Sequence, residues 1–317
     1  MTKIHALKTT RHIAYAIVRA ILLLEISYIV LYPLLYIISI AFRPAAQVED
    51  PNIVWIPTQF TLENVISVWN FIDYPKALFN TFYLDAISVV IQTAVCCMVG
   101  YGFARFPIRF KNILFAIVIF TIIVPPSTTV ISSFLQYRNF DAFYIISTIK
   151  FIFTGDFSGV NILDTPLVLY LPSMFGMGIR SGLFIFIFRQ FFRNVAKELE
   201  EAAYIDGCGA FRCFLKIMVP IARPAILTTF LFSSVWYWND TFYSTVFLDN
   251  VKTVSSSLQY LSDNLSLLSP LGAAIDRFQS VTLIQAGCFL TVIPLVIMYA
   301  FLQKFFTESI EKTGIVG

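Results

Sequence analysis

The sequence predicts an all-α integral membrane protein with six transmembrane helices. Of its 317 residues, 58% are hydrophobic and only 13% are charged, and the mean hydropathy is +0.77. A soluble domain carries about 25% charged residues, so a chain with half that share cannot cover itself with a water-facing surface. In addition, six separate apolar runs are each long enough to cross a bilayer, which takes about 20 residues.

The six runs follow one another along the chain and are separated by more polar segments. They cover residues 20–42, 80–104, 113–135, 166–189, 225–248 and 281–303. The first run is longer than the apolar core of a signal peptide and no small-residue cleavage site follows it, so we expect it to remain as a helix. The segments 43–79 and 136–165 are longer than simple turns. We expect short interfacial helices there, one of them starting at Thr61.

Lys and Arg are divided unequally between the two sides that six crossings would create. Fifteen lie in the N-terminal segment, the second and fourth connections and the C-terminal tail, whereas six lie in the other three connections. The side that is richer in Lys and Arg faces the cytoplasm. We therefore predict that both termini and the fourth connection are cytoplasmic.

The fourth connection contains the unusually charged stretch KELEEAAYIDG, residues 197–207. Its strong helix formers predict a helix over 195–206 that stops at Gly207, followed by a second short helix over 210–218. The helical spacing puts an apolar set on one face and charges on the other; the apolar set is Val195, Leu199, Ala202 and Ala203. Such a helix could lie on the lipid surface, but surface helices usually carry Lys and Arg. This one is acidic, which favours a basic groove on a partner protein.

The longer stretch EAAYIDGCGAFRCFLKIMVP resembles the EAA motif of ABC importer permeases. The matching positions are Glu201, Ala202, Ala203, Gly207, Ile217 and Pro220, and Val219 replaces the usual leucine. FTLENV, GYGFARF, FRQFFRNVAKELEEAA, WYWNDTF and the tail LQKFFTESIEKTGIVG are similar to the maltose-type carbohydrate permeases, which have the type I ABC importer permease fold. The similarity covers nearly all of the chain after about residue 15, although Val195-Ala196 stands where relatives often have an Ile-Pro pair.

This resemblance implies a permease subunit of an ATP-driven importer in the plasma membrane of a bacterium or archaeon. The expected cargo is a carbohydrate, in particular an oligosaccharide, delivered by an extracytoplasmic solute-binding protein. A second homologous permease subunit and two cytoplasmic ABC ATPase subunits would complete the complex. The chain would then divide into residues 1–79, with the N-terminal cytoplasmic segment, first span and outer loop, and a permease core at 80–317.

In such importers the motif helix docks into a cleft of the ATPase, and here it would lie within 195–220. The resemblance assigns the coupling contact to Glu201, Ala202, Ala203, Asp206 and Gly207. Glu201 would pair with a basic residue of the cleft, and the two alanines would permit close packing. Gly207 would form the bend between the two short helices.

The chain itself offers no chemistry for catalysis or nucleotide binding. It has no G-x-x-x-x-G-K-[ST] phosphate loop, so ATP and magnesium would be bound by the partner ATPase and no cofactor is predicted for this chain. The two histidines, His5 and His12, are far in sequence from the cysteines, so no metal site is predicted. We predict neither an enzyme nor a nucleic-acid partner.

Polar residues inside the predicted spans are candidates for a translocation path. Trp236, Asn239, Asp240 and Tyr243 recur at helical spacing in the fifth span, and rings beside amide and carboxylate groups suit a sugar. The alternative is packing between helices through hydrogen bonds. Arg180 lies in the fourth span among Gly176, Gly178 and Gly182, which would permit close contact or a helix break. It could line the path or pair with Asp240.

A different class of function remains open from the residues alone. A self-contained secondary transporter or channel would also be rich in apolar helices, but it predicts matching halves with ion sites at the midplane. The sequence contains no evident pair of halves, and the acidic cytoplasmic stretch would then have no role.

Overall fold

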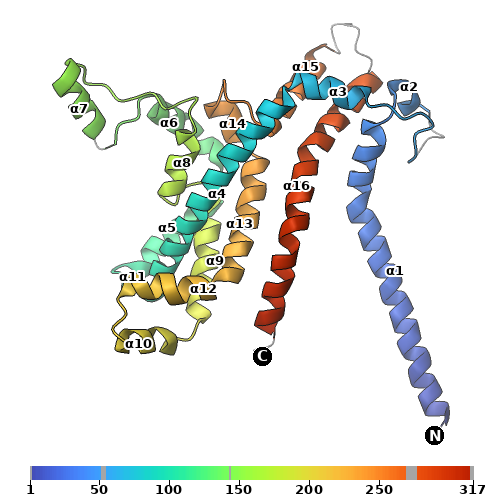
Figure 1. The fold of residues 1–317 in the computed structure, drawn as a ribbon, viewed down its shortest axis with the longest axis horizontal. Helices are drawn as coiled ribbons and strands as arrows, with labels where there is room; N and C mark the ends of the chain where they lie inside the picture. Colours follow the sequence, from blue (N-terminus) through green and yellow to red (C-terminus); the bar gives the residue numbers. More distant parts are fainter. Residues whose placement is uncertain (1, 51–54, 143, 269–276, 315–317) are drawn as a thin grey trace. The chain divides into compact units, whose positions relative to one another are not determined.

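The structure, a computed structural model, describes residues 2–50, 55–142, 144–268 and 277–314 (Figure 1). The described chain is built from helices, and its β structure is limited to an isolated antiparallel bridge between Phe140 and Val160. The predicted all-α class is therefore confirmed. Residues 315–317 of the predicted cytoplasmic tail lie outside the described residues.

The chain forms two compact units. One comprises Met1–Ile72 and Tyr260–Ile293, and the other comprises Asp73–Gln259 and Pro294–Gly317. Both α15 (Val254–Leu268) and α16 (Arg277–Gly314) contribute residues to each unit. The functional division at residue 79 stays a prediction.

The first unit begins with a long apolar helix and two short ones. These are α1 (Thr2–Ala41), α2 (Ala45–Val48) and α3 (Glu63–Phe71). The buried Asn64 side chain donates hydrogen bonds to the carbonyls of Ala41 (3.1 Å) and Arg43 (2.8 Å), which satisfies groups that the end of α1 leaves free. The Thr61 hydroxyl accepts from the Glu63 amide at 3.1 Å, but α3 begins at Glu63 with Leu62 as its N-cap, so the predicted start at Thr61 is one residue too early.

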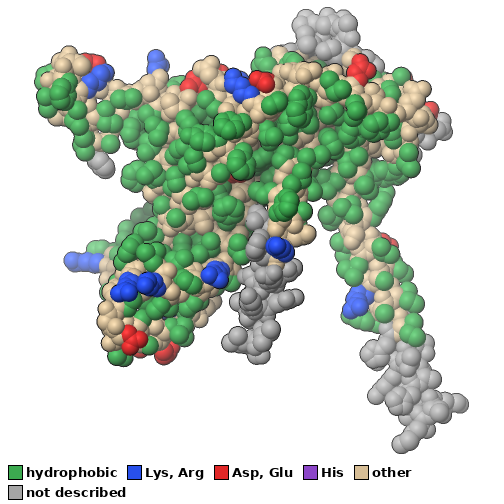
Figure 2. Space-filling view, viewed as in Figure 1, with side chains coloured by type: hydrophobic (Ala, Val, Ile, Leu, Met, Phe, Trp, Pro, Cys, Tyr) green, Lys and Arg blue, Asp and Glu red, His purple; other side chains and the backbone are tan. Residues whose placement is uncertain are grey.

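The second unit contains most of the described helices and the cluster of buried aromatic side chains between α4 and α9. Its helices are α4 (Tyr74–Arg105), α5 (Lys111–Ile123), α6 (Pro126–Arg138), α7 (Ile145–Thr154), α8 (Leu167–Met174), α9 (Ser181–Asn194), α10 (Glu198–Ile205), α11 (Ala210–Cys213), the π-helix η1 (Phe214–Met218), α12 (Val219–Ile221), α13 (Arg223–Trp238) and α14 (Phe242–Phe247). Helix α4 packs against α8, α9 and α13 (Figure 1). Figure 2 shows hydrophobic side chains over the visible face of this unit, with charged ones gathered toward the helix ends.

Within the described part of the chain, three helices are long and apolar enough to cross a membrane: Tyr15–Ala41, Tyr74–Arg105 and Phe278–Phe301. They coincide with the first, second and sixth predicted spans. Two bent pairs of helices pass the same test only when each pair is taken together, so three to five segments of the described chain are long and apolar enough to span a membrane.

The third, fourth and fifth predicted spans are each broken, and the sequence indicated such a break only around Gly176, Gly178 and Gly182. The run 113–135 becomes α5 and α6, which meet at 100° where Pro125 and Pro126 cannot donate backbone hydrogen bonds. The run 166–189 breaks between α8 and α9, and the run 225–248 breaks after Trp238. The last two breaks determine the positions of the polar residues Arg180, Asn239 and Asp240, which are described in the next section.

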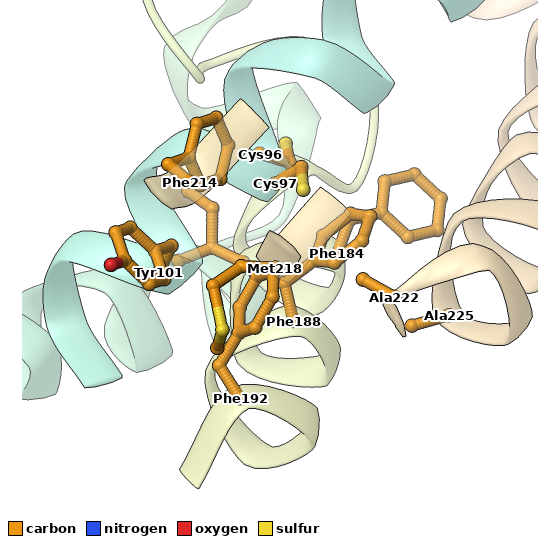
Figure 3. Close-up of a cluster of buried hydrophobic side chains, with 11 residues drawn as sticks. Cys96, Cys97, Tyr101, Phe184, Phe188, Phe192, Phe214, Met218, Ala222 and Ala225 are labelled. Atoms are coloured by element: carbon orange, nitrogen blue, oxygen red, sulfur yellow. The ribbon is translucent and has the colours of Figure 1, made fainter. Parts of the chain in front are cut away.

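A small residue permits the closest packing between α4 and α9. A Cβ atom added at Gly100 would lie 2.5 Å from the Phe188 Cβ and 3.0 Å from the Arg189 backbone nitrogen. Because α9 would have to move away, only glycine fits this crossing. The adjoining cluster holds the same helices together through buried aromatic side chains, among them Phe184, Phe188 and Phe192 (Figure 3).

We expect Gly100→Ala to destabilise the protein by about 1–3 kcal/mol, the usual cost of overpacking. Gly102→Ala is the matched control, since it lies in the same helix and its added Cβ would meet nothing closer than Phe106 at 4.0 Å. The measurement is the thermal midpoint of the detergent-solubilised protein. Equal midpoints for the two variants would contradict the close α4–α9 contact.

Candidate functional site

The acidic stretch folds as predicted at its C-terminal end but starts later. Helix α10 covers Glu198–Ile205, and Gly207 follows with a φ of +78°, the left-handed conformation expected for a glycine stop. The predicted start at Val195 is wrong, because Val195 is extended and caps the end of α9. The Val195 carbonyl accepts a hydrogen bond from the Arg105 guanidinium at 2.7 Å, which fixes this extended link.

Glu200 holds α10 against the end of α4. Its carboxylate lies 2.7 Å from Arg105 Nε and accepts a hydrogen bond from the Tyr101 hydroxyl at 2.6 Å. The side chains of Arg105 and Glu200 are only 7% and 8% exposed, so water cannot replace either partner. A buried charge is tolerated when it is paired and hydrogen-bonded, as it is here. The charged face of α10 is thus divided, with Glu200 turned inward.

The second short helix anchors the same loop by apolar packing. The predicted helix over 210–218 is present as α11 followed by η1, a helix with a π-type turn. Phe214 and Met218 from η1 enter the core beside Tyr101 and Phe192 (Figure 3). The Tyr101 and Phe214 ring centroids are 4.9 Å apart. We use the name coupling loop for residues 198–221, which are fixed to α4 and α9 by both contacts.

The outer face of the coupling loop differs from the one predicted. Of the expected apolar set Val195, Leu199, Ala202 and Ala203, the structure buries only Ala203. Leu199 is exposed, and Ile205 and Phe211 are 86% and 66% exposed. Glu201, Ala202, Asp206 and Gly207 are all exposed as well. The loop therefore presents an apolar surface edged by carboxylates.

A break in the helical backbone places Arg180 at the start of α9. Gly176 and Arg180 have φ values of +70° and +60°, and the chain turns between them instead of continuing α8. A Cβ atom at Gly178 would lie 2.6 Å from the Tyr237 hydroxyl, and one at Gly182 would lie 2.6 Å from Thr121 Oγ1. The predicted roles of these glycines, a helix break and close contact, are both confirmed.

Buried polar side chains satisfy the backbone at this break. The Gln92 side chain donates to the Ile179 carbonyl at 2.6 Å and to the Ser181 hydroxyl at 2.9 Å, and it accepts from Ser233 at 2.9 Å. The Tyr237 hydroxyl accepts a hydrogen bond from the Ile179 amide at 3.3 Å. Three helices, α4, α9 and α13, therefore converge on one irregular turn.

Arg180 extends from this turn onto α13. Its guanidinium lies 4.5 Å from the centre of the Trp236 ring, a cation–π contact. Arg180 is exposed and Trp236 is 39% exposed, so the pair faces open space in this chain. The sequence predicted both residues as candidates but did not predict their contact.

Asp240 has a structural contact instead of the expected pairing with Arg180. Its carboxylate accepts hydrogen bonds from the Tyr243 amide at 3.1 Å and the Ser244 amide at 2.8 Å, and thereby caps α14. Among the described side chains Asp240 makes no ion pair with Arg180. The expected pairing is therefore wrong.

The other candidates in WYWNDTF also separate at the break after α13. The predicted single helical face does not form, because α13 ends at Trp238 and α14 begins at Phe242. The exposed Asn239 side chain donates back to the Val235 carbonyl at 2.9 Å. Tyr243 packs on Phe247 in an aromatic cluster, with 6.0 Å between ring centroids. Of the five candidates, the structure joins Arg180 and Trp236 through their side chains, and Asp240 contacts another candidate only at the Tyr243 backbone amide.

Sequence reasoning did not identify the residues that fix both sites. Gln92 and Tyr237 lie in apolar runs, and nothing in their spacing indicates that they meet Ile179. Tyr101 and Arg105 lie in GYGFARF, which was noted only for its resemblance to known permeases. An arginine that ends an apolar run beside an acidic loop could have suggested the ion pair with Glu200.

Comparison with known proteins identifies the family. Residues 97–312 match the model of the binding-protein-dependent transport system inner membrane component family. The chain belongs to this family. The matched region contains the coupling loop and the Arg180 turn, and the resemblance to ABC importer permeases predicted from the EAA stretch is confirmed.

Several known proteins align with almost the whole chain. The arabinooligosaccharides transport system permease protein AraQ of Halalkalibacterium halodurans is 26% identical, over 92% of this chain and 93% of its own. Protein LplC of Bacillus subtilis is 26% identical over the full length of both chains. The polygalacturonan/rhamnogalacturonan transport system permease protein YtcP of the same organism is 24% identical, over 93% and 96%.

A solved structure shares the fold. A chain of a bacterial ABC transporter involved in the import of the acidic polysaccharide alginate matches with a TM-score of 0.65 at 21% sequence identity. The match covers 92% of this chain and 96% of that one. The chain therefore has the permease fold of an ABC importer.

We expect Glu200→Ala to loosen the coupling loop, because it leaves the Arg105 guanidinium buried without its carboxylate. Breaking a buried ion pair from one side costs about 3–5 kcal/mol. Glu201→Ala is the control, since Glu201 is exposed in the same turn of α10. Amide hydrogen exchange over residues 198–208 should accelerate in the first variant and stay near wild type in the second. Equal exchange in both variants would show that Glu200 does not anchor the loop.

Proposed function

We propose that this chain is the membrane-spanning permease subunit of an ATP-driven importer whose cargo is a carbohydrate, with an oligosaccharide as the expected class. The complex would contain a second homologous permease, two cytoplasmic ATPase subunits that bind ATP and magnesium, and an extracytoplasmic solute-binding protein. The chain would cross the membrane six times with both termini in the cytoplasm. The broken helices α5–α6, α8–α9 and α13–α14 would each take part in a crossing.

The observation that carries the proposal is the construction of the coupling loop. It is fixed on its inner side by a buried ion pair and by the Phe214 and Met218 side chains, while Ile205 and Phe211 remain exposed on its outer side. A rigidly attached loop with an apolar, acid-edged surface can transmit movement from a bound partner to α4 and α9. A free lipid-surface helix would need no such attachment.

The family also supports the role of a subunit over that of a self-contained transporter. Its description is that of an inner membrane component of a larger, binding-protein-dependent system. A self-contained secondary transporter would carry its own ion-coupling site and would not need an exposed apolar loop. The two proposals differ in one measurable property, which is whether the chain transports without an ATPase.

The cargo class rests on the relatives and on the Arg180–Trp236 pair. Two of the relatives above are named as permeases for arabinooligosaccharides and for polygalacturonan or rhamnogalacturonan. An indole ring that is part exposed offers a surface for the C–H faces of a sugar ring. The adjacent guanidinium can donate hydrogen bonds to hydroxyl or carboxylate oxygens.

Glu201→Lys tests the coupling role. We expect ATP-dependent uptake by proteoliposomes containing the whole complex to fall by more than about tenfold, since reversing one charge of an interfacial pair costs at least 2 kcal/mol. Glu198→Lys is the matched control, because it makes the same charge change on an exposed residue of the same helix. Normal uptake by the Glu201 variant would contradict the coupling role. Uptake by the chain alone, without ATPase, would overturn the proposed function.

Trp236→Ala tests the path. If the ring contacts the passing sugar, the substrate concentration for half-maximal uptake should rise by about tenfold. This is the effect on affinity of losing an aromatic contact of roughly 1.4 kcal/mol. Phe232→Ala is the control, one helical turn earlier and likewise exposed in α13. Basal ATP hydrolysis should stay unchanged in both variants. An unchanged uptake curve for the Trp236 variant would remove it from the path.

A further inference from the structure

A cavity of about 440 Å³ opens beside the base of the coupling loop, within the second unit. Five of its lining side chains are cationic: Arg105, Lys111, Arg189, Arg193 and Lys197. The remaining lining residues are Phe103, Ala104 and Asn112. The cavity therefore gathers positive charge from the end of α4, the start of α5 and the end of α9.

Most of this charge is not neutralised by the carboxylates that the structure describes. Arg105 is paired with Glu200, but Lys111, Arg189, Arg193 and Lys197 form no ion pair with any described carboxylate. Like charges that share a partly enclosed space repel one another more strongly than in bulk water. An anion in the cavity would remove that repulsion.

Arg189 is the clearest sign of a missing partner. Its guanidinium lies 3.8 Å from the centre of the Phe115 ring, which fixes its plane at the cavity wall. Its Nε atom is buried and has no hydrogen-bond acceptor in the described part of the chain. By contrast, Lys111 already donates to the carbonyls of Ala104 (3.3 Å) and Phe106 (3.0 Å). The guanidinium also carries N–H donors beyond Nε, and a phosphate oxygen in the cavity is an acceptor that suits them.

The surroundings of the cavity favour a lipid over a free anion. Helix α5 starts at the cavity with Lys111 and continues as an apolar helix. Ile113, Ile117 and Phe120 are 60%, 55% and 62% exposed, and helical spacing places them on the face of α5 opposite the cavity, so the helix is apolar even on its outer side. A free phosphate would use only the cations, whereas a phospholipid with its headgroup in the cavity would also extend its acyl chains into the apolar zone that begins where α5 starts. Basic pockets between membrane helices are known sites for anionic headgroups.

We propose that this cavity binds the phosphate headgroup of an anionic phospholipid, with its acyl chains along α5. Lys197 directly precedes α10, and Arg105 binds Glu200 and the Val195 carbonyl. A bound headgroup would thus contact the residues at which the coupling loop is attached. The proposal does not depend on which solute the complex carries, and it can be tested by binding alone.

The test compares the thermal stabilisation of the purified detergent-solubilised protein by phosphatidylglycerol and by phosphatidylcholine with the same acyl chains. We expect the wild type to bind phosphatidylglycerol more tightly. In the double variant Arg193→Gln/Lys197→Gln, affinity for phosphatidylglycerol should fall by about thirtyfold, taking about five- to sixfold for each cation. Both residues are exposed, so the variant should melt like the wild type without lipid.

A matched control removes two positive charges elsewhere. Lys76→Gln/Arg138→Gln changes exposed residues that do not line the cavity, and it should retain the preference for phosphatidylglycerol. Equal loss in both double variants would overturn the proposal, because it would indicate a general charge effect. Equal binding of the two lipids by the wild type would also overturn it.

Two further results would reject the lipid as the occupant. Inorganic phosphate that stabilises the wild type as well as phosphatidylglycerol does would show that a free anion fills the cavity. A structure of the whole complex with acidic partner residues inside the cavity would assign it to a protein contact. Retention of phosphatidylglycerol by the purified wild type, and its loss from the cavity variant, would support the proposal.

Discussion

The buried pair of Arg105 and Glu200 determines where the coupling loop lies. A guanidinium and a carboxylate that are both withdrawn from water must remain together, because either one alone would be an uncompensated buried charge. Arg105 ends the longest helix of the second unit, and its guanidinium also binds the Val195 carbonyl, so the link between α9 and α10 is extended and the start of α10 is fixed. The aromatic contact of Tyr101 with Phe214 then holds the second half of the loop. A movement of the loop therefore has to move α4 and α9.

The irregular turn before α9 also depends on buried polar groups that need partners. In an apolar environment each backbone group that leaves a helix needs another partner. Gln92 supplies a donor for the Ile179 carbonyl and the Tyr237 hydroxyl supplies an acceptor for the Ile179 amide. The break is therefore stable, and Arg180 is presented at the start of α9 in contact with Trp236. At the next break, the Asp240 carboxylate accepts from the free backbone amides at the start of α14. Because its oxygens are used there, Asp240 does not pair with Arg180.

Charge is separated over a short distance around the loop attachment. The exposed surface of the coupling loop combines apolar side chains with acidic ones, whereas the adjoining cavity is lined by cations. The two surfaces suit different chemistries, since a basic protein groove would accept the first and an anionic group the second. Glu200 and Arg105 lie between them. The ion pair thus anchors the loop, and its arginine also lines the cavity.

The sequence by itself determined the membrane class, the apolar runs, the family and the helix stop at Gly207, because each depends on composition or on local backbone preference. It also named Glu201 and Ala202 as candidates for contact with a partner, and both are exposed, but it overlooked the buried Glu200. Only the tertiary structure decided which carboxylate is buried, where three of the apolar runs break, and which polar residues meet. Those outcomes depend on partners such as Arg105 and Glu200, or Gln92 and Ile179, that are about ninety residues apart in the chain. Local patterns carry no information about such distant pairs, and a buried polar group is stable only where its distant partner arrives.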